Sequence, residues 1–267
     1  MPHVSVDGLD LNFALDGPVE APVIAFSNSL GASLAMWEPQ VAALSDRFRC
    51  LRYDTRGHGG SASPDRPATI DDLAGDLRGI LDALGMVRAH LVGLSLGGMT
   101  AQAFAAASPE RVDRLVLMAT AAQLGPPSTW DERAATARRD GMGALVEGVL
   151  ARWFTPAFAD DPRLARVRAE ILATDPAGYA RACGAIRDMD LRDRLPAIQA
   201  PTLIIAGAED PATPPSLAEI LHASIAGSEL FVVPDAAHLL NIEAADAVNR
   251  LLLDHLGGAR PSQHPQG

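Results

Sequence analysis

The stretch "AHLVGLSLGGMTAQAFAAAS", residues 89–108, decides the fold. An apolar strand, Ala89 to Leu94, runs into Gly93-x-Ser95-x-Gly97, and an Ala-rich helix follows at once. A serine on such a sharp strand-to-helix turn is held with its hydroxyl above the sheet, and small residues at 93 and 97 let neighbouring backbone pass close by. The helix N-terminus beside the serine favours developing negative charge. A plain Gly/Ser turn is the alternative, but this context predicts that Ser95 is a nucleophile.

Outward from this motif, the chain alternates between strand-length apolar runs and helical patterns. The runs are "PVIAFSN", "FRCLRYD", "AHLVGLS", "VDRLVLMAT", "PTLIIAG" and "SELFVVPDAAH". Strands that are apolar throughout suit a parallel sheet covered on both faces by helices. Two alternating segments at the start, "HVSVDG" and "LDLNFALDG", predict an antiparallel hairpin. The fold class is therefore α/β, with a mostly parallel central sheet.

The alternation breaks between residues 121 and 195. This segment has helical patterns and prolines but no apolar run of strand length. We predict a helical cap at 121–195, inserted into a core formed by residues 1–120 and 196–257. The final residues, 258–267, read "GARPSQHPQG" and are expected to form a disordered tail.

Composition excludes several classes of function. The formal net charge of the 267 residues is -11, which disfavours nucleic-acid binding, because that needs a basic face. Cys50 and Cys183 stand in no metal or redox spacing, so we expect neither a disulfide nor a metal or other cofactor. Cys50 lies in an apolar strand pattern typical of a buried, inert thiol. No signal peptide or membrane-length apolar run is seen, which predicts a cytoplasmic protein with no membrane partner. The oligomeric state is left open.

A nucleophilic serine needs a base, and the base needs an orienting acid. In this architecture the chain order is serine, then acid, then histidine. Asp210 follows a late strand in "LIIAGAEDPATP", with Glu209 as its rival, and His238 follows the next strand in "LFVVPDAAHLL". A capping aspartate and a packed histidine are the alternatives. Asp54 also follows a strand but precedes the serine, which is the wrong order. We predict the triad Ser95, Asp210 and His238.

Together these features resemble the α/β-hydrolase superfamily over nearly the whole chain. The resemblance rests on the triad order, the "DTRGHGGS" loop and the mid-chain helical segment. His58, in that loop, is interpreted as loop structure or pocket wall. Five stretches are similar to the 3-oxoadipate enol-lactonases: "SNSLGASLAMWEPQ", "LRYDTRGHGGS", "GLSLGGMTAQ", "RWFTPAF" and "LRDRLPAIQAPTLIIAGAEDPATPP". This resemblance implies a serine acyl-enzyme mechanism that opens a small anionic lactone to 3-oxoadipate in protocatechuate or catechol breakdown.

The resemblance also implies an oxyanion hole made of backbone N–H groups. One donor is Leu96, directly after the nucleophile, and the second is Leu30, in the "SNSLG" loop after the strand that starts at Val23. Ser27 and Asn28 are expected to brace this loop through local hydrogen bonds from side chain to backbone. Ser29 has two open interpretations, a bracing role or contact with substrate.

An anionic substrate needs a cation in a net-negative protein. Arg133, in "STWDERAA", and Arg152, in "ARWFTP", lie in the predicted cap beside Trp130 and Trp153. Surface arginines on amphipathic helices are the alternative for either one. We favour Arg133, and we expect Ser29, Trp130, Arg133 and Trp153 to bind the substrate.

Other functions remain compatible with these residues. A carbon–carbon bond hydrolase or a general carboxylesterase shares every triad residue, and a non-catalytic ligand receptor of the same fold can also keep the triad. Ser95 excludes the aspartate-nucleophile enzymes of this fold. Turnover of a lactone or activated ester, abolished with Ser95, separates an enzyme from a receptor.

Overall fold

A single mixed sheet forms the centre of the molecule. The structure is a computed structural model that describes residues 2–258. Its eight strands lie in the order β1-β2-β4-β3-β5-β6-β7-β8. Their bounds are β1 (His3–Val6), β2 (Leu9–Asp16), β3 (Val23–Ser27), β4 (Arg49–Tyr53), β5 (Ala89–Leu94), β6 (Val112–Met118), β7 (Thr202–Gly207) and β8 (Glu229–Val233).

Strand pairing confirms the predicted topology. β1 pairs with β2 as an antiparallel hairpin, and β2 also pairs antiparallel with β4. The remaining neighbours are parallel, from β4 through β3, β5, β6 and β7 to β8. Parallel strands end on the same edge of a sheet, so the loops that follow β3, β5, β7 and β8 meet there. This edge carries the predicted catalytic residues.

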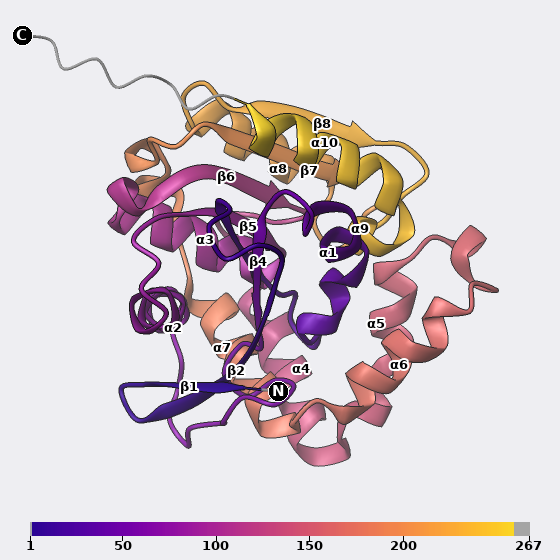
Figure 1. Cartoon of the computed structure of the whole chain (residues 1–267). Coiled ribbons are helices and arrows are strands. Elements are labelled where there is room, and N and C mark those ends of the chain that lie inside the picture. Colours follow the sequence, from indigo (N-terminus) through magenta and orange to yellow (C-terminus); the bar gives the residue numbers. More distant parts are fainter. Residues whose placement is uncertain (1, 259–267) are drawn as a thin grey trace, which may run out of the picture.

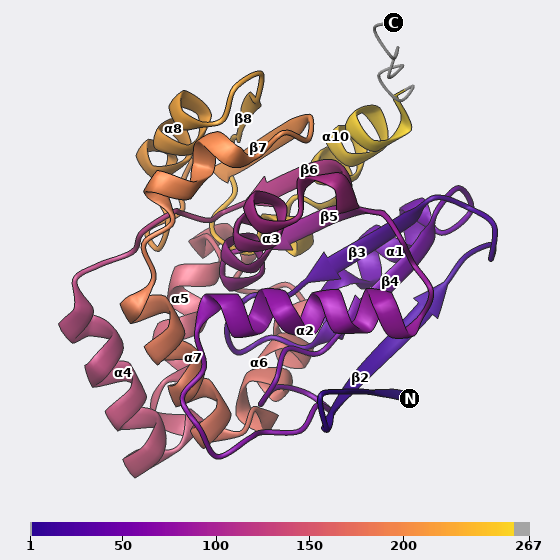
Figure 2. The ribbon, with the colours of Figure 1, turned by 90° about the vertical axis from the view of Figure 1, so that its left-hand side faces the viewer.

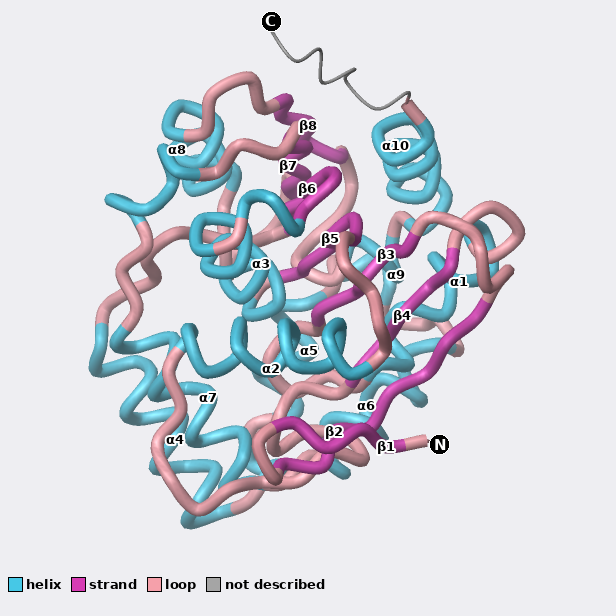
Figure 3. The backbone as a smooth tube through the Cα atoms, turned by 60° about the vertical axis from the view of Figure 1, so that its left-hand side comes forward, coloured by secondary structure: helices cyan, strands magenta, loops and turns pink. Residues whose placement is uncertain are grey.

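Helices cover both faces of the sheet, as the buried strands require. Their bounds are α1 (Glu38–Leu44), α2 (Ile70–Ala83), α3 (Leu96–Ala107), α8 (Pro215–Ser224), α9 (Leu240–Glu243) and α10 (Ala245–Gly257). Figure 3 shows α2, α3 and α8 on one side of the strands and α1, α9 and α10 on the other. Short 3-10 turns occur at η1 (Leu34–Trp37), η2 (Pro109–Arg111), η3 (Met142–Ala144), η4 (Pro156–Phe158) and η5 (Arg192–Ala197).

Local sequence sets the ends of α2. The Thr69 hydroxyl accepts a hydrogen bond from the Asp72 amide at 3.1 Å, and the Asp72 carboxylate accepts one from the Thr69 amide at 2.9 Å. This reciprocal pair is a capping box, which satisfies N–H groups that the first helical turn leaves without partners. Gly85 follows the helix with φ of +69°, a conformation that glycine adopts without strain.

Four further helices lie between β6 and β7, and we call them the helical insertion. They are α4 (Pro127–Asp140), α5 (Val146–Trp153), α6 (Arg163–Ala173) and α7 (Pro176–Asp188). Figures 1 and 2 show them grouped together on one side of the sheet, with α4 packed against α7.

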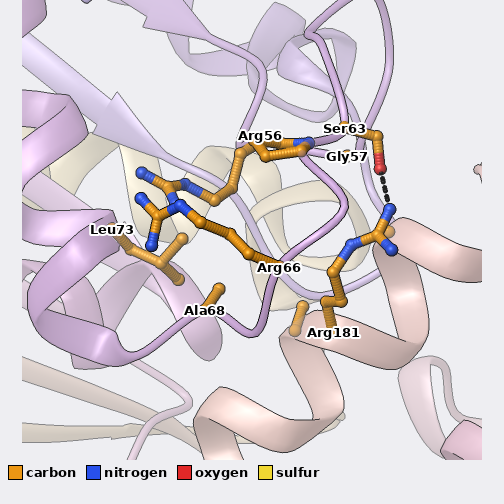
Figure 4. A pocket seen from close by; sticks show the side chains of 10 residues that line it. Arg56, Gly57, Ser63, Arg66, Ala68, Leu73 and Arg181 are labelled. Carbon is orange, nitrogen blue, oxygen red and sulfur yellow. Dashed lines mark hydrogen bonds between the residues drawn. The ribbon is translucent and has the colours of Figure 1, made fainter. Parts of the chain in front are cut away.

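Helix α7 meets the core at a contact between two backbones. A Cβ added to Gly178 would lie 2.3 Å from the Gly57 carbonyl oxygen, so neither position has room for a side chain. Beside this contact, the Ser63 hydroxyl donates to Asp175 at 2.7 Å and accepts from Arg181 at 2.5 Å. Figure 4 shows Ser63 and Arg181 reaching toward each other across the junction. The loop after β4 and the start of α7 are therefore fitted to one another.

The edge strand β8 differs from the expectation that helices cover every strand, whereas the two cysteines are buried as a strand pattern suggested for Cys50. β8 is an edge strand, and its Phe231 and Val232 are 44% and 46% exposed, so helices do not cover this strand on both faces. Cys50 and Cys183 are buried free thiols, and burial raises the pKa of each to about 12. The predicted tail, apart from Gly258, lies outside the described residues.

Candidate active site

Ser95 occupies a strained turn between β5 and α3. Its φ and ψ are +56° and -116°, a conformation that costs a non-glycine residue free energy and is found at functional sites. A Cβ at Gly97 would lie 1.9 Å from the Ser27 carbonyl oxygen, and one at Gly93 would lie 2.3 Å from the Gly97 carbonyl oxygen. Glycine is therefore required on both sides of the serine, because the backbone at the end of β3 passes directly against Gly97 and the first turn of α3 folds back against Gly93. Ser95 is 7% exposed.

Asp210 and His238 form a buried hydrogen-bonded pair. Asp210 lies in the loop after β7, and His238 lies in the loop after β8. His238 Nδ1 and Asp210 Oδ2 are 2.8 Å apart, and both residues are only 3% exposed. The three predicted triad residues therefore follow β5, β7 and β8, which end on one edge of the sheet. This is the arrangement that the chain order anticipates.

Further hydrogen bonds hold the Asp210 carboxylate in place. Its Oδ1 accepts from the Ala212 and Thr213 amides at 2.7 and 3.0 Å, and its Oδ2 accepts from the Thr213 hydroxyl at 2.7 Å. Burial on its own raises the pKa of Asp210, but attraction to His238 and the hydrogen bonds outweigh it and hold the pKa below its ordinary value. The carboxylate is thus ionised and able to orient an imidazole.

The two candidate oxyanion donors are backbone amides at element ends. Leu96 is the first residue of α3, where N–H groups have no intrahelical acceptor. Leu30 follows β3 in the "SNSLG" loop, and Gly31 after it has φ of +83°. Within residues 2–258, neither amide has a hydrogen-bond acceptor. Both N–H groups are therefore available to a negatively charged oxygen.

The polar side chains of the "SNSLG" loop have specific partners. The Ser27 hydroxyl bonds the Tyr53 hydroxyl at 2.8 Å. Asn28 donates to the Tyr53 carbonyl and accepts from the Trp37 indole, each at 2.8 Å. These contacts brace the loop, although through distant residues rather than the local bonds that we expected. Ser29, between Asn28 and Leu30, is buried as well.

Asp54 has a structural role behind the same loop. Its carboxylate accepts from the Asn12 side chain at 2.6 Å, the Leu34 amide at 2.7 Å and the Gly60 amide at 2.8 Å. These bonds join β2, the start of η1 and the loop after β4. His58, in that loop, is buried, which lowers its pKa, and its Nδ1 faces the Arg56 carbonyl oxygen at 3.2 Å.

Arg133 and Arg152 lie close together in the helical insertion. Arg133 stacks over Trp130, with the guanidinium carbon 4.9 Å from the ring centroid, and donates to the Tyr179 hydroxyl at 2.7 Å. The pKa of Arg152 is lowered, first by burial and then by repulsion from Arg133. Among the described residues, neither arginine forms an ion pair, and the buried Nε of Arg133 has no partner. Two unneutralised guanidinium groups favour a bound anion.

Tyr179 joins the arginines to the oxyanion loop, and sequence reasoning missed it. A Cβ added to Gly31 would lie 3.2 Å from the Tyr179 ring, so this ring packs directly against that glycine. Its hydroxyl is the one that Arg133 contacts. Thr213, beside Asp210, was also missed. The "DPAT" spacing, a hydroxyl three residues after the acid, is the signal that could have found it.

The two tryptophans occupy different places. Trp130 is buried and donates from its indole to the Leu124 carbonyl at 2.8 Å. Trp153 ends α5, and its carbonyl accepts from the Leu239 amide at 2.9 Å, beside His238. In the part of the chain that the structure describes, no group of three or more metal-ligating side chains is found. None of the helices in residues 2–258 has the length and apolarity needed to cross a membrane.

Comparison with known proteins gives a consistent result. The chain matches a family model described as the alpha/beta hydrolase fold over residues 22–245. It is 39% identical over 241 residues to 3-oxoadipate enol-lactonase 2 of Acinetobacter baylyi, with 90% of each chain covered. It is 40% identical over 238 residues to 3-oxoadipate enol-lactonase 1 of the same organism, with 88% of this chain and 89% of the relative covered.

A solved structure agrees with these sequence matches. The crystal structure of the enol-lactonase from Burkholderia xenovorans superposes with a TM-score of 0.94 at 45% identity, and the match covers 96% of this chain and 100% of that one. This chain belongs to the alpha/beta hydrolase fold family.

Proposed function

We propose that this protein hydrolyses 3-oxoadipate enol-lactone to 3-oxoadipate in the degradation of aromatic compounds by the protocatechuate or catechol route. The relatives named for this activity support the proposal. The observation that carries it is the pair Arg133 and Arg152, which has no carboxylate partner among the described residues and lies next to Tyr179. The substrate is a small lactone bearing one carboxylate, and this pair supplies the cation that such a substrate needs.

Acylation begins at Ser95. His238 removes the serine proton through Nε2, while Asp210 holds the Nδ1–H tautomer and stabilises the imidazolium that forms. The serine oxygen attacks the lactone carbonyl carbon, and the resulting oxyanion is bound by the Leu30 and Leu96 amides. The ring C–O bond then breaks, and His238 protonates the departing enol oxygen.

Deacylation releases the product. Water, activated by His238, attacks the acyl carbon, and the Ser95 oxygen leaves with the proton that the histidine returns. The freed enol becomes a ketone, which makes ring opening strongly downhill. The overall reaction consumes one water and requires no metal or organic cofactor.

The helical insertion supplies substrate recognition in this proposal. We divide the chain into a hydrolase core, 1–120 and 196–257, and a cap, 121–195, that carries Trp130, Arg133, Arg152 and Trp153. Arg133 binds the substrate carboxylate, with Arg152 beside it, and Tyr179 fixes the distance from that carboxylate to the oxyanion loop. Ser29 lies in the loop on the side of the reacting carbonyl. The protein is expected to work in the cytoplasm on this small anionic partner.

The decisive experiment compares an anionic lactone with a neutral ester. Purified protein is assayed on 3-oxoadipate enol-lactone and on a neutral ester of similar size, and we expect kcat/KM to favour the lactone by at least about tenfold. Ser95→Ala should lower turnover of both by several orders of magnitude with the fold intact. A carboxylesterase would instead prefer the neutral ester, and binding without turnover would indicate a receptor.

A further inference from the structure

The Glu243 carboxylate joins the helical insertion to the loop that carries His238. Its Oε1 accepts from the Thr155 amide at 2.9 Å and from the Thr155 hydroxyl at 2.6 Å. Its Oε2 accepts from the Ala237 amide at 2.7 Å. Glu243 ends α9, Thr155 follows α5, and Ala237 directly precedes His238. One carboxylate thus bridges two segments that are far apart in the sequence.

Two more bonds run alongside this bridge. The Leu239 amide, directly after His238, donates to the Trp153 carbonyl at 2.9 Å. Arg163, at the start of α6, donates to the Ile242 carbonyl at 2.7 Å. The residues on both sides of His238 are therefore bonded, one through Glu243 and one directly, to the segment 153–155.

We propose that Glu243 is a positioning residue that sets the place of His238 and couples it to the substrate-binding end of α5. The inference rests on the proposed function, because it takes His238 as the base and Arg152 and Trp153 as substrate-binding residues. Glu243 acts through the backbone at Ala237 and through Thr155. It exchanges no proton with the substrate.

The chemistry of the three donors explains why an ionised carboxylate stands here. Each partner of Glu243 in the bridge donates a hydrogen bond, and a carboxylate is an acceptor at both oxygens. Glutamine has nearly the same shape, but its NH2 group would face either the Ala237 N–H or the Thr155 donors. Because an NH2 group cannot accept a hydrogen bond from an N–H group, the bond to Ala237 or the bond to the Thr155 amide is then lost. Hydrogen bonds to a charged acceptor are also stronger than those between neutral groups.

The bridge has a consequence for catalysis. A base must stand within hydrogen-bond reach of the proton that it removes, and a displacement of about 1 Å can cost roughly 100-fold in rate. Opening the bridge loosens the backbone at Ala237, directly before His238, while the Leu239–Trp153 and Asp210–His238 bonds remain. The proposal therefore predicts a loss in kcat rather than in substrate affinity.

The test compares E243Q with E38Q, a matched control. Glu38 of α1 accepts from Arg166 of α6 at 2.6 Å, so it also joins the core to the helical insertion through a Glu carboxylate. E38Q removes the charge from that contact, which lies on the exposed surface. Thr155→Val removes one donor from the bridge, and Thr155→Ser restores the hydroxyl.

Three measurements are made on the full-length protein: kcat and KM for the enol-lactone, the rate at which a fluorophosphonate labels Ser95, and Tm. For E243Q we expect kcat and the labelling rate to fall about 10-fold or more, with KM within twofold. E38Q should stay within twofold on every rate. Thr155→Val should lose a part of kcat that Thr155→Ser recovers.

Other outcomes overturn the idea in separable ways. Equal rates for E243Q and E38Q, with the wild type active and labelled, refute the positioning role alone. A drop in Tm with unchanged rates per folded molecule refutes it as well, because it shows a purely structural bridge. If the wild type is neither active nor labelled, the proposed function fails and takes this inference with it.

Discussion

His238 Nδ1 donates a hydrogen bond to Oδ2 of Asp210 over 2.8 Å, and both side chains are nearly sealed from solvent. The bond selects the tautomer in which Nε2 is free to accept a proton. Thr213 donates to the same carboxylate oxygen and lies 3.2 Å from Nδ1 of the histidine. Hydrogen bonds from its own loop therefore hold the Asp210 carboxylate in the position from which it orients His238.

Asp210→Asn should abolish most of the activity while leaving the fold in place. An asparagine amide can donate to Nδ1, which would stabilise the wrong tautomer. In serine proteases the same change costs about 10⁴-fold in kcat. We expect a loss of roughly 10³- to 10⁴-fold in kcat for the lactone, measured with the far-UV circular dichroism spectrum as control. A loss under tenfold would return Glu209 to consideration as the acid.

The lowered pKa of Asp210 predicts how stability depends on pH. Folding stabilises the carboxylate, so its contribution is complete above the unfolded pKa of about 4 and is lost as pH falls through the lower folded value. Urea unfolding of wild type and Asp210→Asn should therefore differ by a constant amount above about pH 5. The difference should shrink as the pH is lowered toward 2. Asp160→Asn, on the surface, is the control, and a gap that widens in acid would contradict the assignment.

Removing either cap arginine should discriminate between substrates by charge. Arg133→Met and Arg152→Met keep an apolar stem but remove the cation. A hydrogen bond to a charged group contributes about 1.5–3 kcal/mol, so KM for the anionic lactone should rise roughly 10- to 150-fold. The neutral ester should change by less than threefold. Arg139→Met, on the exposed side of α4, is the matched control. Equal effects on both substrates would remove the arginines from carboxylate binding.

Tyr179→Phe tests the connection between the arginines and the oxyanion loop. The ring against Gly31 is kept, while the hydroxyl that Arg133 contacts is lost. We expect KM for the lactone to rise about 3- to 10-fold, less than in Arg133→Met, because the guanidinium stays charged but is no longer held. A double-mutant cycle with Arg133→Met should show that the two effects are not additive. Full additivity would mean that the tyrosine acts independently.

Two glycines of α7 should respond to alanine in opposite directions. At Gly178 the new methyl group would meet the Gly57 carbonyl, and such overpacking typically costs about 1–3 kcal/mol. At Gly184, on the same helix, a Cβ meets nothing within 4 Å, and alanine is the better helix former by up to about 1 kcal/mol. Urea unfolding should show Gly178→Ala below and Gly184→Ala above wild type. Destabilisation in both would point to the helix itself rather than the junction.

The sequence was most informative about the places of residues that follow strand ends. Ser95, Asp210 and His238 each follow an apolar strand, and parallel strands bring their ends to one edge. The order of these residues along the chain therefore predicts their neighbourhood in space. The glycines at 93 and 97 were predictable for the same reason, because the turn has to pass other backbone closely.

Residues that act across the fold were not predictable in this way. Tyr179 matters because its ring reaches Gly31, and Glu243 because it reaches Thr155. Both sit in helical patterns where a tyrosine or a glutamate is ordinary. Their contacts depend on how the helical insertion is oriented on the core, and no periodicity encodes that orientation. Phe231 shows the same limit, since an apolar strand residue was expected to be covered and lies at an open edge.

Asp54 gives the amino-terminal hairpin an importance that its peripheral position hides. Through Asp54, Asn12 of β2 is connected to the Leu34 amide, three residues after the end of the "SNSLG" loop. A change in β2 can therefore be transmitted, through two hydrogen bonds, to the segment that follows the "SNSLG" loop. For practical work, an affinity tag or a fusion partner belongs behind α10 rather than ahead of β1, and a shortened amino terminus should be checked for lost turnover before it is used in crystallisation or screening.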